Sequence, residues 1–223
     1  LTGFNEPEAV GVLVGEGQKL ARFASPHSVW LDLGSVKQPV VQALTGVLPN
    51  FVGSHPMAGG HEKGPDHAWP DLFEGSVCIV TPLPTDPPEA VTRIEGLWRA
   101  VGARVVRRDP AGHDREVAWM SHVPHVLAFA FTRALGEAPA SARDVAGPGF
   151  RDFTRIARSD AELWADILVA NAKAVAGPLA RVAAELAEAA RRLETGDADA
   201  LERWIHEARA RLVGGDEGDR ERD

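Results

Sequence analysis

The sequence predicts an α/β domain followed by an all-α domain, and three observations lead to this division. Up to about residue 110, short β-branched runs alternate with helix-like segments, the pattern of stacked βα units with a largely parallel sheet. From Glu116 the hydrophobic spacing becomes helical. The length of 223 residues suits one large or two small domains. We therefore expect domains at residues 1–110 and 111–213, with a disordered charged tail at 214–223.

Four runs of five or six residues predict the strands. Each is rich in β-branched side chains and is flanked by Gly, Pro or Asp, as strands usually are. They are residues 28–33, 50–54, 76–81 and 103–107. Between them, the spacing of apolar residues predicts helices over Val40–Thr45 and Pro88–Val101.

The second half reads as helices separated by short loops. Helical spacing covers three stretches: 116–135, 160–193 and 197–212. Pro178 follows Gly177 inside the middle stretch, and proline removes a backbone donor and clashes with the preceding turn. We therefore expect two helices there rather than one. Asp197 is the predicted N-cap of the last helix, and Gly214 begins the segment that ends it.

Composition excludes several classes of protein. The 32 acidic residues exceed the 24 basic ones, so a net charge of −8 gives no field that attracts a phosphate backbone. We expect no nucleic-acid partner. No apolar stretch reaches the ~18 residues of a membrane span, and no signal peptide is visible, so we expect no membrane partner. Cys78 is the single cysteine and lies in an apolar run, which favours a cytoplasmic protein.

The first chemical motif is Leu31-Asp-Leu-Gly-Ser-Val-Lys37, a strand that runs into Gly34. At the carboxyl end of a parallel strand, side chains and free amides face the crevice where α/β sheets bind ligands. Ser35 and Lys37 are well placed for binding. In isolation, the plainer interpretation is an N-cap serine and a surface lysine.

The second motif is Gly53-Ser-His-Pro-Met-Ala-Gly-Gly60, again just past a predicted strand. Small residues surround His55, which lets a ligand approach the backbone. A histidine at such a position is a good general base, since its ordinary pKa of ~6.5 leaves it largely neutral at pH 7. The alternative is a loop histidine bonded to a carbonyl group.

A third cluster contains three histidines. His113-Asp114 precedes Ser121-His-Val-Pro-His125, in which His122 and His125 share a helix face while Pro124 perturbs the helix. Eight histidines raise the question of a metal. We expect none, because the six-residue spacing of His55, His61 and His67 matches no helical face and no H-E-x-x-H motif is present.

The fourth motif runs from Gly147 to Asp160, with Trp164 four residues later. Its arginines, Arg151, Arg155 and Arg158, supply forked donors that suit a carboxylate or phosphate, and Trp164 supplies a flat apolar wall. The alternative is a solvated basic helix face.

Taken in order, D-x-G-S-V-K, H-P-M-A-G, H-D, S-H-x-P-H and G-F-R-D-x-T-R-I-A-x-S-D-x-x-L-W resemble the motifs of the prephenate/arogenate dehydrogenase family. The resemblance covers residues 10 to about 175. It implies a Rossmann-like domain for NAD or NADP and a helical domain that forms a homodimer. It also implies the oxidative decarboxylation of prephenate or arogenate on the way to tyrosine, without a metal.

The resemblance assigns roles to five side chains. His55 resembles the catalytic histidine that accepts the proton of the substrate C4 hydroxyl. Ser35 resembles the serine that holds this hydroxyl and the nicotinamide in register, and His125 the second active-site histidine. Arg155 resembles the arginine that binds a substrate carboxylate, and Trp164 the aromatic residue near the pocket.

The same resemblance places Gly34, together with Ser35, at the cofactor and Gly149 at the substrate. His61 also falls at the substrate, where members of the family often carry Glu after H-P-x-A-G. A histidine there disfavours the ammonium group of arogenate, so it favours prephenate.

The N-terminus departs from the family pattern. The family begins with a strand, a G-x-G-x-x-G turn and a helix, and the sequence contains no such turn. Residues 1–9 look like the end of the second Rossmann strand, and Gly11–Gly17 do not replace the turn. We therefore expect an N-terminally incomplete Rossmann-like domain. The cofactor preference cannot be read, and a family member that binds ligands without catalysis is the alternative to a dehydrogenase.

Overall fold

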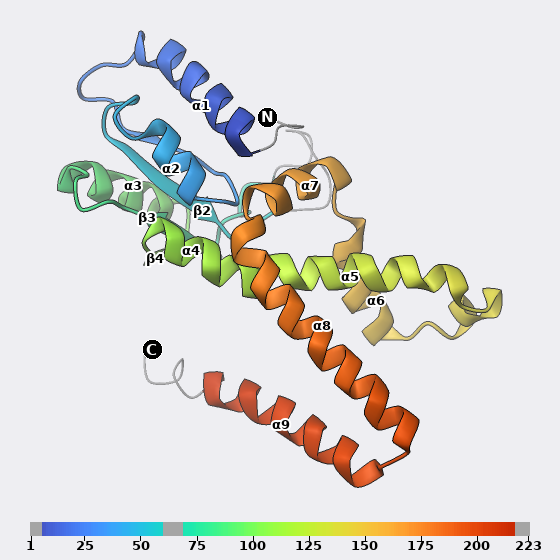
Figure 1. Cartoon of the computed structure of the whole chain (residues 1–223). Coiled ribbons are helices and arrows are strands. Elements are labelled where there is room, and N and C mark those ends of the chain that lie inside the picture. Colours follow the sequence, from blue (N-terminus) through green and yellow to red (C-terminus); the bar gives the residue numbers. More distant parts are fainter. Residues whose placement is uncertain (1–5, 60–68, 217–223) are drawn as a thin grey trace. The chain divides into compact units, whose positions relative to one another are not determined.

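The structure is a computed structural model and describes residues 6–59 and 69–216. The chain divides into two compact units, Leu1–Ala176 and Gly177–Asp223. The first contains a sheet with its covering helices, followed by further helices (Figure 1). The second contains the end of α8 (Ala172–Thr195) and α9 (Ala198–Asp216). The predicted order, an α/β part before an all-α part, is confirmed.

The sheet has four strands in the order β1-β2-β3-β4. Their bounds are β1 (Trp30–Leu31), β2 (Phe51–Pro56), β3 (Val77–Thr81) and β4 (Arg104–Arg107), and each coincides with a predicted run. The pairs β1–β2 and β3–β4 are parallel. Helix α2 (Gln38–Leu44) connects the first pair, and α3 (Pro88–Ala100) connects the second.

The expectation of a largely parallel sheet was wrong at its centre. Strands β2 and β3 are antiparallel, with His55 opposite Ile79. A parallel pair needs a crossover connection that is usually helical. Residues 57–59 and 69–76, the described parts of this connection, contain turns and no helix. The sheet therefore consists of two parallel pairs joined antiparallel.

Helices cover both faces of the sheet. Successive residues of a strand point to opposite faces, and Phe51 and Val52 of β2 belong to different hydrophobic clusters. Val52 packs in the cluster of α3, which includes Ile94 and Trp98. Phe51 packs with α2 at Leu44. Burial of each such side chain contributes roughly 1.5–3 kcal/mol, so the two clusters hold the strands that carry the site.

Helix α1 (Glu6–Ala21) was not predicted. The expectation that residues 1–9 end a strand fails for residues 6–9, which are helical, while residues 1–5 lie outside the described part. Three glycines lower the helix propensity of this segment. Its partly buried Leu13 and Val14 pack in the cluster of α2, so tertiary packing favours the helix.

Between the sheet and α8, the first unit contains three 3-10 helical turns and five other helical elements. The five others are α4 (Pro110–Val117), a π-helical turn (Ala118–His122), α5 (Val123–Ala134), α6 (Pro148–Arg155) and α7 (Ala161–Ala170). Aspartates begin two of them: Asp109 accepts a hydrogen bond from the Gly112 amide at 2.8 Å, and Asp160 accepts one from the Leu163 amide at 2.8 Å. Asp160 thus begins α7 in place of the longer predicted helix.

The two helices predicted for the middle stretch are confirmed as α7 and α8, but they separate at Asn171, and the break predicted at Pro178 was wrong because α8 runs through it. The preceding Gly177 has no Cβ to clash with the proline ring, which lowers the cost of the helical conformation. The predicted cap at Asp197 is confirmed, since its carboxylate accepts a hydrogen bond from the Ala200 amide at 2.9 Å. Helix α9 extends through Gly214 to Asp216, and the rest of the predicted tail lies outside the described residues.

No single helix in the described ranges is long and apolar enough to cross a membrane. Helices α7 and α8 meet the length and composition criteria only together, and the pair is bent by 98° at the junction between them.

Candidate active site

The site begins at the carboxyl ends of β1 and β2, which lie at the same edge because the two strands are parallel. Asp32, just after β1, joins the two ends. Its Oδ1 atom accepts a hydrogen bond from the Ser54 amide at 3.1 Å, and its carbonyl oxygen accepts one from the Ser54 hydroxyl at 2.6 Å. The loop that carries Gly34 and Ser35 is thereby held beside the strand that carries His55.

Lys37 lies beneath this loop and is fully buried, so the surface-lysine interpretation was wrong. Its ammonium forms an ion pair with Asp32 and donates to the Ser54 carbonyl oxygen at 2.8 Å. Burial lowers the pKa of Lys37, and the Asp32 carboxylate opposes this shift. Asp32 also accepts a hydrogen bond from the Gly34 amide at 3.0 Å. The ion pair with the buried Lys37 therefore fixes the carboxylate that holds the Gly34–Ser35 loop.

His55 lies on β2 and is only 8% exposed. Its Nδ1 atom is 2.8 Å from Nε2 of His113, a ring on α4 that is fully buried. Desolvation, reinforced by His113 and the Lys37 cation, lowers the pKa of His55 to about 3. His55 is therefore neutral at pH 7, as a general base must be. The alternative of a loop histidine bonded to a carbonyl group is excluded for Nδ1, which faces an imidazole.

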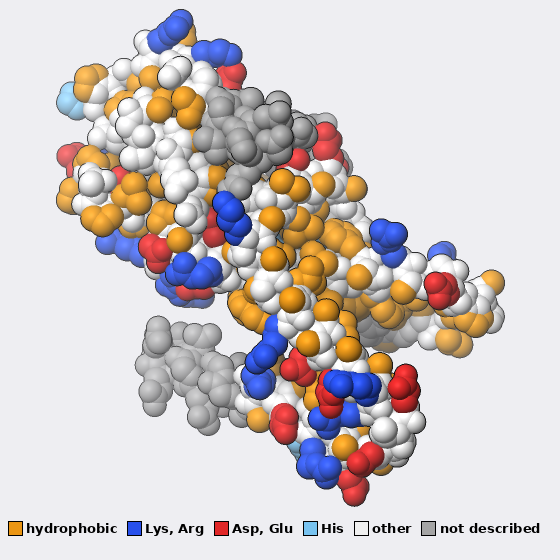
Figure 2. All heavy atoms as spheres, viewed as in Figure 1, with side chains coloured by type: hydrophobic (Ala, Val, Ile, Leu, Met, Phe, Trp, Pro, Cys, Tyr) orange, Lys and Arg blue, Asp and Glu red, His pale blue; other side chains and the backbone are white. Residues whose placement is uncertain are grey.

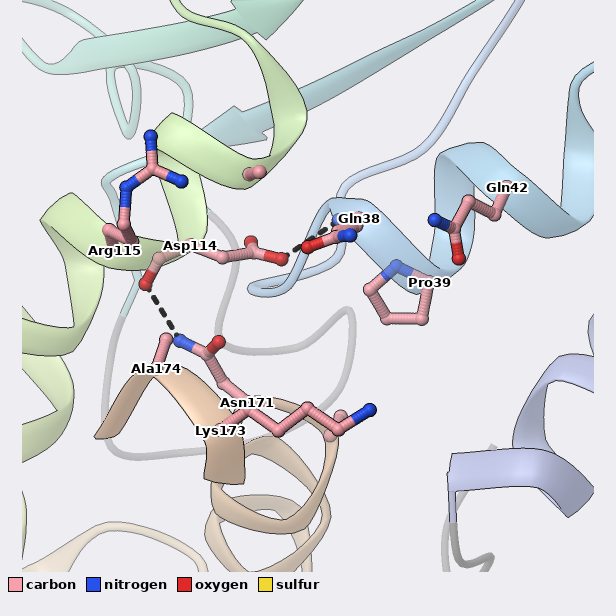
Figure 3. Close-up of a pocket in the computed structure, with 10 residues that line it drawn as sticks. Gln38, Pro39, Gln42, Asp114, Arg115, Asn171, Lys173 and Ala174 are labelled. Atoms are coloured by element: carbon pink, nitrogen blue, oxygen red, sulfur yellow. Dashed lines mark hydrogen bonds between the residues drawn. The ribbon is translucent and has the colours of Figure 1, made fainter. Parts of the chain in front are cut away.

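Asp114 continues this chain of hydrogen bonds. Its Oδ1 atom is 2.7 Å from Nδ1 of His113. The same carboxylate accepts hydrogen bonds from the backbone amides of Lys37 at 2.7 Å and Gln38 at 2.9 Å, where α2 begins. Figure 3 shows the Asp114 side chain pointing to Gln38. Hydrogen bonds thus connect α4 both to the strand that carries His55 and to the helix that follows the Gly34–Ser35 loop.

Asn171 ties the helical segments to the same point. Its side-chain nitrogen donates to the Asp114 carbonyl oxygen at 2.9 Å, a contact visible in Figure 3, and is 3.0 Å from Nδ1 of His122. A cavity of about 420 Å³ borders this junction. Its lining residues come from α2, α4 and the α7–α8 junction: Gln38, Pro39, Gln42, Ala111, Asp114, Arg115, Ala170, Asn171, Lys173 and Ala174.

His122 and His125 meet at Trp164, so the prediction that they share a helix face is confirmed. The His125 ring stacks on the indole with centroids 3.6 Å apart, and the His122 ring contacts it edge-on at 5.9 Å. Burial lowers the pKa of His122 to about 4. Pro124 cannot donate to a carbonyl in the preceding turn, and that turn, residues 118–122, is a π-helix.

The other predicted site residues are Gly149, Arg155, Ser35 and His61. Gly149 is in the first turn of α6 and Arg155 ends that helix, which packs against α5. Ser35 is half-buried in the loop beside the His55 strand. His61 lies outside the described residues. Within the described ranges, no three His, Cys, Asp or Glu side chains gather as a metal site.

The roles of three residues of the site were not identified from the sequence. Lys37 is a buried cation, and the hydrogen bonds of Asp114 and Asn171 connect separate helices. His113-Asp114 stood out as a motif, yet its partner His55 is 58 residues away in the chain. The signal that could have found the pair is a His-Asp dipeptide in the first helix after the sheet, where buried polar side chains need partners.

Comparison with known families decides the relationship. A model of the prephenate dehydrogenase nucleotide-binding domain matches residues 13–107, and a model of the prephenate dehydrogenase dimerization domain matches residues 109–207. The chain belongs to the prephenate/arogenate dehydrogenase family. The resemblance seen in the motifs is therefore confirmed.

Two relatives that carry the names of dehydrogenases are similar to this chain. The chain is 34% identical over 189 residues to the cyclohexadienyl dehydrogenase of Zymomonas mobilis, covering 82% of this chain and 64% of the relative. It is 34% identical over 200 residues to the prephenate dehydrogenase of Bacillus subtilis, covering 86% of this chain and 54% of the relative. The chain thus spans between half and two thirds of the length of these relatives.

Solved structures of the family have the same fold. Prephenate dehydrogenase from Aquifex aeolicus, in complex with hydroxyphenyl propionate and NAD+, superposes with a TM-score of 0.81 at 29% identity, covering 92% of this chain and 73% of that chain. Synechocystis arogenate dehydrogenase superposes with a TM-score of 0.77 at 25% identity, covering 92% and 76%.

Proposed function

We propose that the protein is a prephenate dehydrogenase that converts prephenate to 4-hydroxyphenylpyruvate and CO2 in tyrosine biosynthesis, with NAD or NADP as the oxidant. The observation that carries this proposal is the position of His55. It is a neutral imidazole at the edge of the sheet, in a member of this dehydrogenase family, with a pKa lowered to about 3. Because the ring is neutral, one of its nitrogens has a lone pair that can accept a hydroxyl proton.

His55 accepts the proton of the C4 hydroxyl. As the C4 carbon becomes a carbonyl, its hydride leaves, and the bound nicotinamide supplies the acceptor for that hydride. Loss of CO2 then makes the ring aromatic, which drives the reaction. Ser35 holds the C4 hydroxyl in register with the nicotinamide. No step in this sequence requires a metal.

The loop after β1 fits the nicotinamide end of a dinucleotide. A Cβ atom at Gly34 would lie 3.1 Å from Oδ2 of Asp32 and 3.7 Å from Nζ of Lys37. A side chain there would therefore crowd the buried ion pair, whereas glycine lets a flat ring approach the backbone. Gly34 and Ser35 are the cofactor-binding residues in this proposal, within a partial cofactor domain at residues 1–110.

The substrate is held from the helical side. Trp164 and His125 form one aromatic wall, with the two rings stacked. Arg155 binds a substrate carboxylate through its forked guanidinium, and Gly149 precedes it on the same helix. His61, which lies outside the described residues, is assigned to the substrate by the motif resemblance alone, and a histidine there favours the keto acid prephenate over arogenate.

A homodimer forms through residues 111–213 in this proposal. Figure 2 shows hydrophobic side chains gathered over the helical part of the first unit. Exposed members of this class on α5–α7 are Phe131, Phe153, Leu163 and Val169. Their exposure, together with the match to a dimerization domain, supports a second copy as the partner. The lone buried Cys78 supports a cytoplasmic location.

Product analysis tests the proposal. The full natural protein is incubated with prephenate or arogenate, each with NAD+ and with NADP+, and the products are separated. We expect 4-hydroxyphenylpyruvate from prephenate. Tyrosine from arogenate alone would replace prephenate by arogenate as the substrate. Thermal stabilisation by prephenate without product would show a binding protein instead.

A further inference from the structure

The side chain of Asp114 has three hydrogen-bond partners in the structure. Its two carboxylate oxygens face the backbone amides of Lys37 and Gln38, at 2.7 and 2.9 Å, and both amides can only donate. Its side chain is 6% exposed, so water does not replace these partners. The third partner, Nδ1 of His113 at 2.7 Å, must therefore carry the proton that this contact requires.

The proton on Nδ1 of His113 determines whether the other ring nitrogen, Nε2, donates or accepts a hydrogen bond. A neutral imidazole with a proton on Nδ1 has a lone pair on Nε2. That lone pair faces Nδ1 of His55 at 2.8 Å. Since His113 accepts in this contact, His55 donates from Nδ1.

We propose that Asp114 and His113 are positioning residues that hold His55 as the Nδ1–H tautomer and leave its Nε2 atom free to accept the substrate proton. The proposal rests on the proposed function for the identity of that proton. The other tautomer carries a proton on Nε2 and cannot act as a base there. The carboxylate reaches the base through a second imidazole, so neither Asp114 nor His113 needs to contact the substrate.

The neighbouring contacts make this arrangement rigid. Asn171 donates to the Asp114 backbone, as Figure 3 shows, and lies 3.0 Å from Nδ1 of His122. Asn171, His113 and His122 are all at most 4% exposed. The two tautomers differ only in proton positions, and the buried partners determine which of them is populated.

The ring nitrogens of His55 report the tautomer directly. The full natural protein, labelled with 15N-histidine and free of substrate and nucleotide, is studied by NMR at pH 7.5. The His55 signals are identified by their loss in the His55→Asn variant. We expect a protonated-type shift for Nδ1 and an unprotonated-type shift for Nε2. A proton on Nε2 of His55 in the unsubstituted protein would overturn the proposal.

Asp114→Asn tests the origin of the tautomer, because an amide can donate as well as accept. We expect a mixture of His55 tautomers and a fall in kcat in proportion to the Nδ1–H fraction that is lost, roughly two- to tenfold, with KM for prephenate unchanged. Asp109→Asn is the matched control, since the side chain of this aspartate caps the same helix and has no hydrogen bond to the His113 ring. Asparagine caps helices about as well as aspartate, so stability and the His55 shifts should both stay nearly the same.

The outcomes separate this proposal from the proposed function. The inferred tautomer in a protein that does not turn over prephenate would leave the positioning role intact and remove the proposed reaction. An unchanged His55 tautomer and an unchanged kcat in Asp114→Asn would contradict the positioning role. If Asp114→Asn fails to fold, the spectrum of the unsubstituted protein still decides the tautomer.

Discussion

The imidazole of His125 stacks on the indole of Trp164, with ring centroids 3.6 Å apart and an interplanar angle of 19°. The two residues come from α5 and α7, 39 positions apart in the numbering, and they were expected separately, His125 as the second active-site histidine and Trp164 as the aromatic residue near the pocket. Through this contact the two side chains form one continuous aromatic surface. The contact also orients His125, whose Nδ1 donates to the Ser121 carbonyl oxygen at 2.9 Å.

His55→Asn should lower kcat by roughly 10²-fold or more, because a general base is lost. The asparagine keeps a polar group near Nε2 of His113, so the thermal midpoint should change little. Steady-state kinetics and thermal unfolding of the same preparation check both statements. Turnover close to that of the unsubstituted protein would remove His55 from the catalytic role.

Arg155→Ala should mainly raise KM for prephenate. A charge-assisted contact to a carboxylate is worth ~1.5–3 kcal/mol, which corresponds to a rise of roughly ten- to a hundredfold. Arg151→Ala serves as the control, since that side chain donates to the Ala146 carbonyl oxygen at 3.0 Å. If KM rises in the control and stays constant in Arg155→Ala, the carboxylate site belongs to Arg151.

Gly53→Ala should destabilise the fold by roughly 1–3 kcal/mol, the range of an overpacked core. The new Cβ atom would lie 2.5 Å from Oγ1 of Thr81 and 2.8 Å from Cγ2 of Val41. The control is Gly96→Ala on the exposed side of α3, where a Cβ meets nothing within 4 Å. It should be neutral or stabilising, by up to ~1 kcal/mol. Urea unfolding of both variants measures the difference, and equal stabilities would contradict the packing described for β2.

Acid should destabilise the protein through His55 and His122. Their pKa values are lowered to about 3 and about 4, so below pH 6.5 the unfolded chain binds protons that the folded chain does not. Their stabilising contribution is full above pH 6.5 and is lost as the pH falls toward 4. Each histidine adds a slope of up to ~1.4 kcal/mol per pH unit in this window.

His122→Asn should therefore flatten the dependence of the unfolding free energy on pH between 6.5 and 4. The charged or titratable groups around His122 are Asp114, His113 and His125, and these remain in the variant. His206→Asn, at an exposed position of α9, is the control and should leave the slope unchanged. Identical slopes in the two variants would contradict the burial of a neutral His122.

The strands and most helices could be predicted because their signals are local. The run at Val77–Thr81 is β-branched, and the helix at Pro88–Ala100 shows regular apolar spacing. The antiparallel pairing of β2 with β3 could not, because strand direction depends on the long connection between them. Helix α1 was missed for a related reason: its stability comes from contacts with α2 that no local propensity encodes.

The residues of the candidate site were likewise predictable only where their signal is local. His55, His125 and Trp164 could be recognised because their motifs are short and specific. The chain from His55 through His113 to Asp114 could not, because it is made by side chains 58 residues apart that meet only after β2 and α4 pack together. Pro178 illustrates the limit of a local rule, since α8 runs through it, and the glycine before it lessens only the clash of the proline ring with the preceding residue.

Prephenate-dependent reduction of NAD+ or NADP+ tests the central claim most directly. Calorimetric binding of each nucleotide to the full natural protein is measured in the same buffer. We predict that at least one nucleotide binds and that prephenate is then turned over, with one CO2 released for each nucleotide reduced. Binding of prephenate and nucleotide without reduction would contradict the claim and leave a family member that binds these ligands without catalysis.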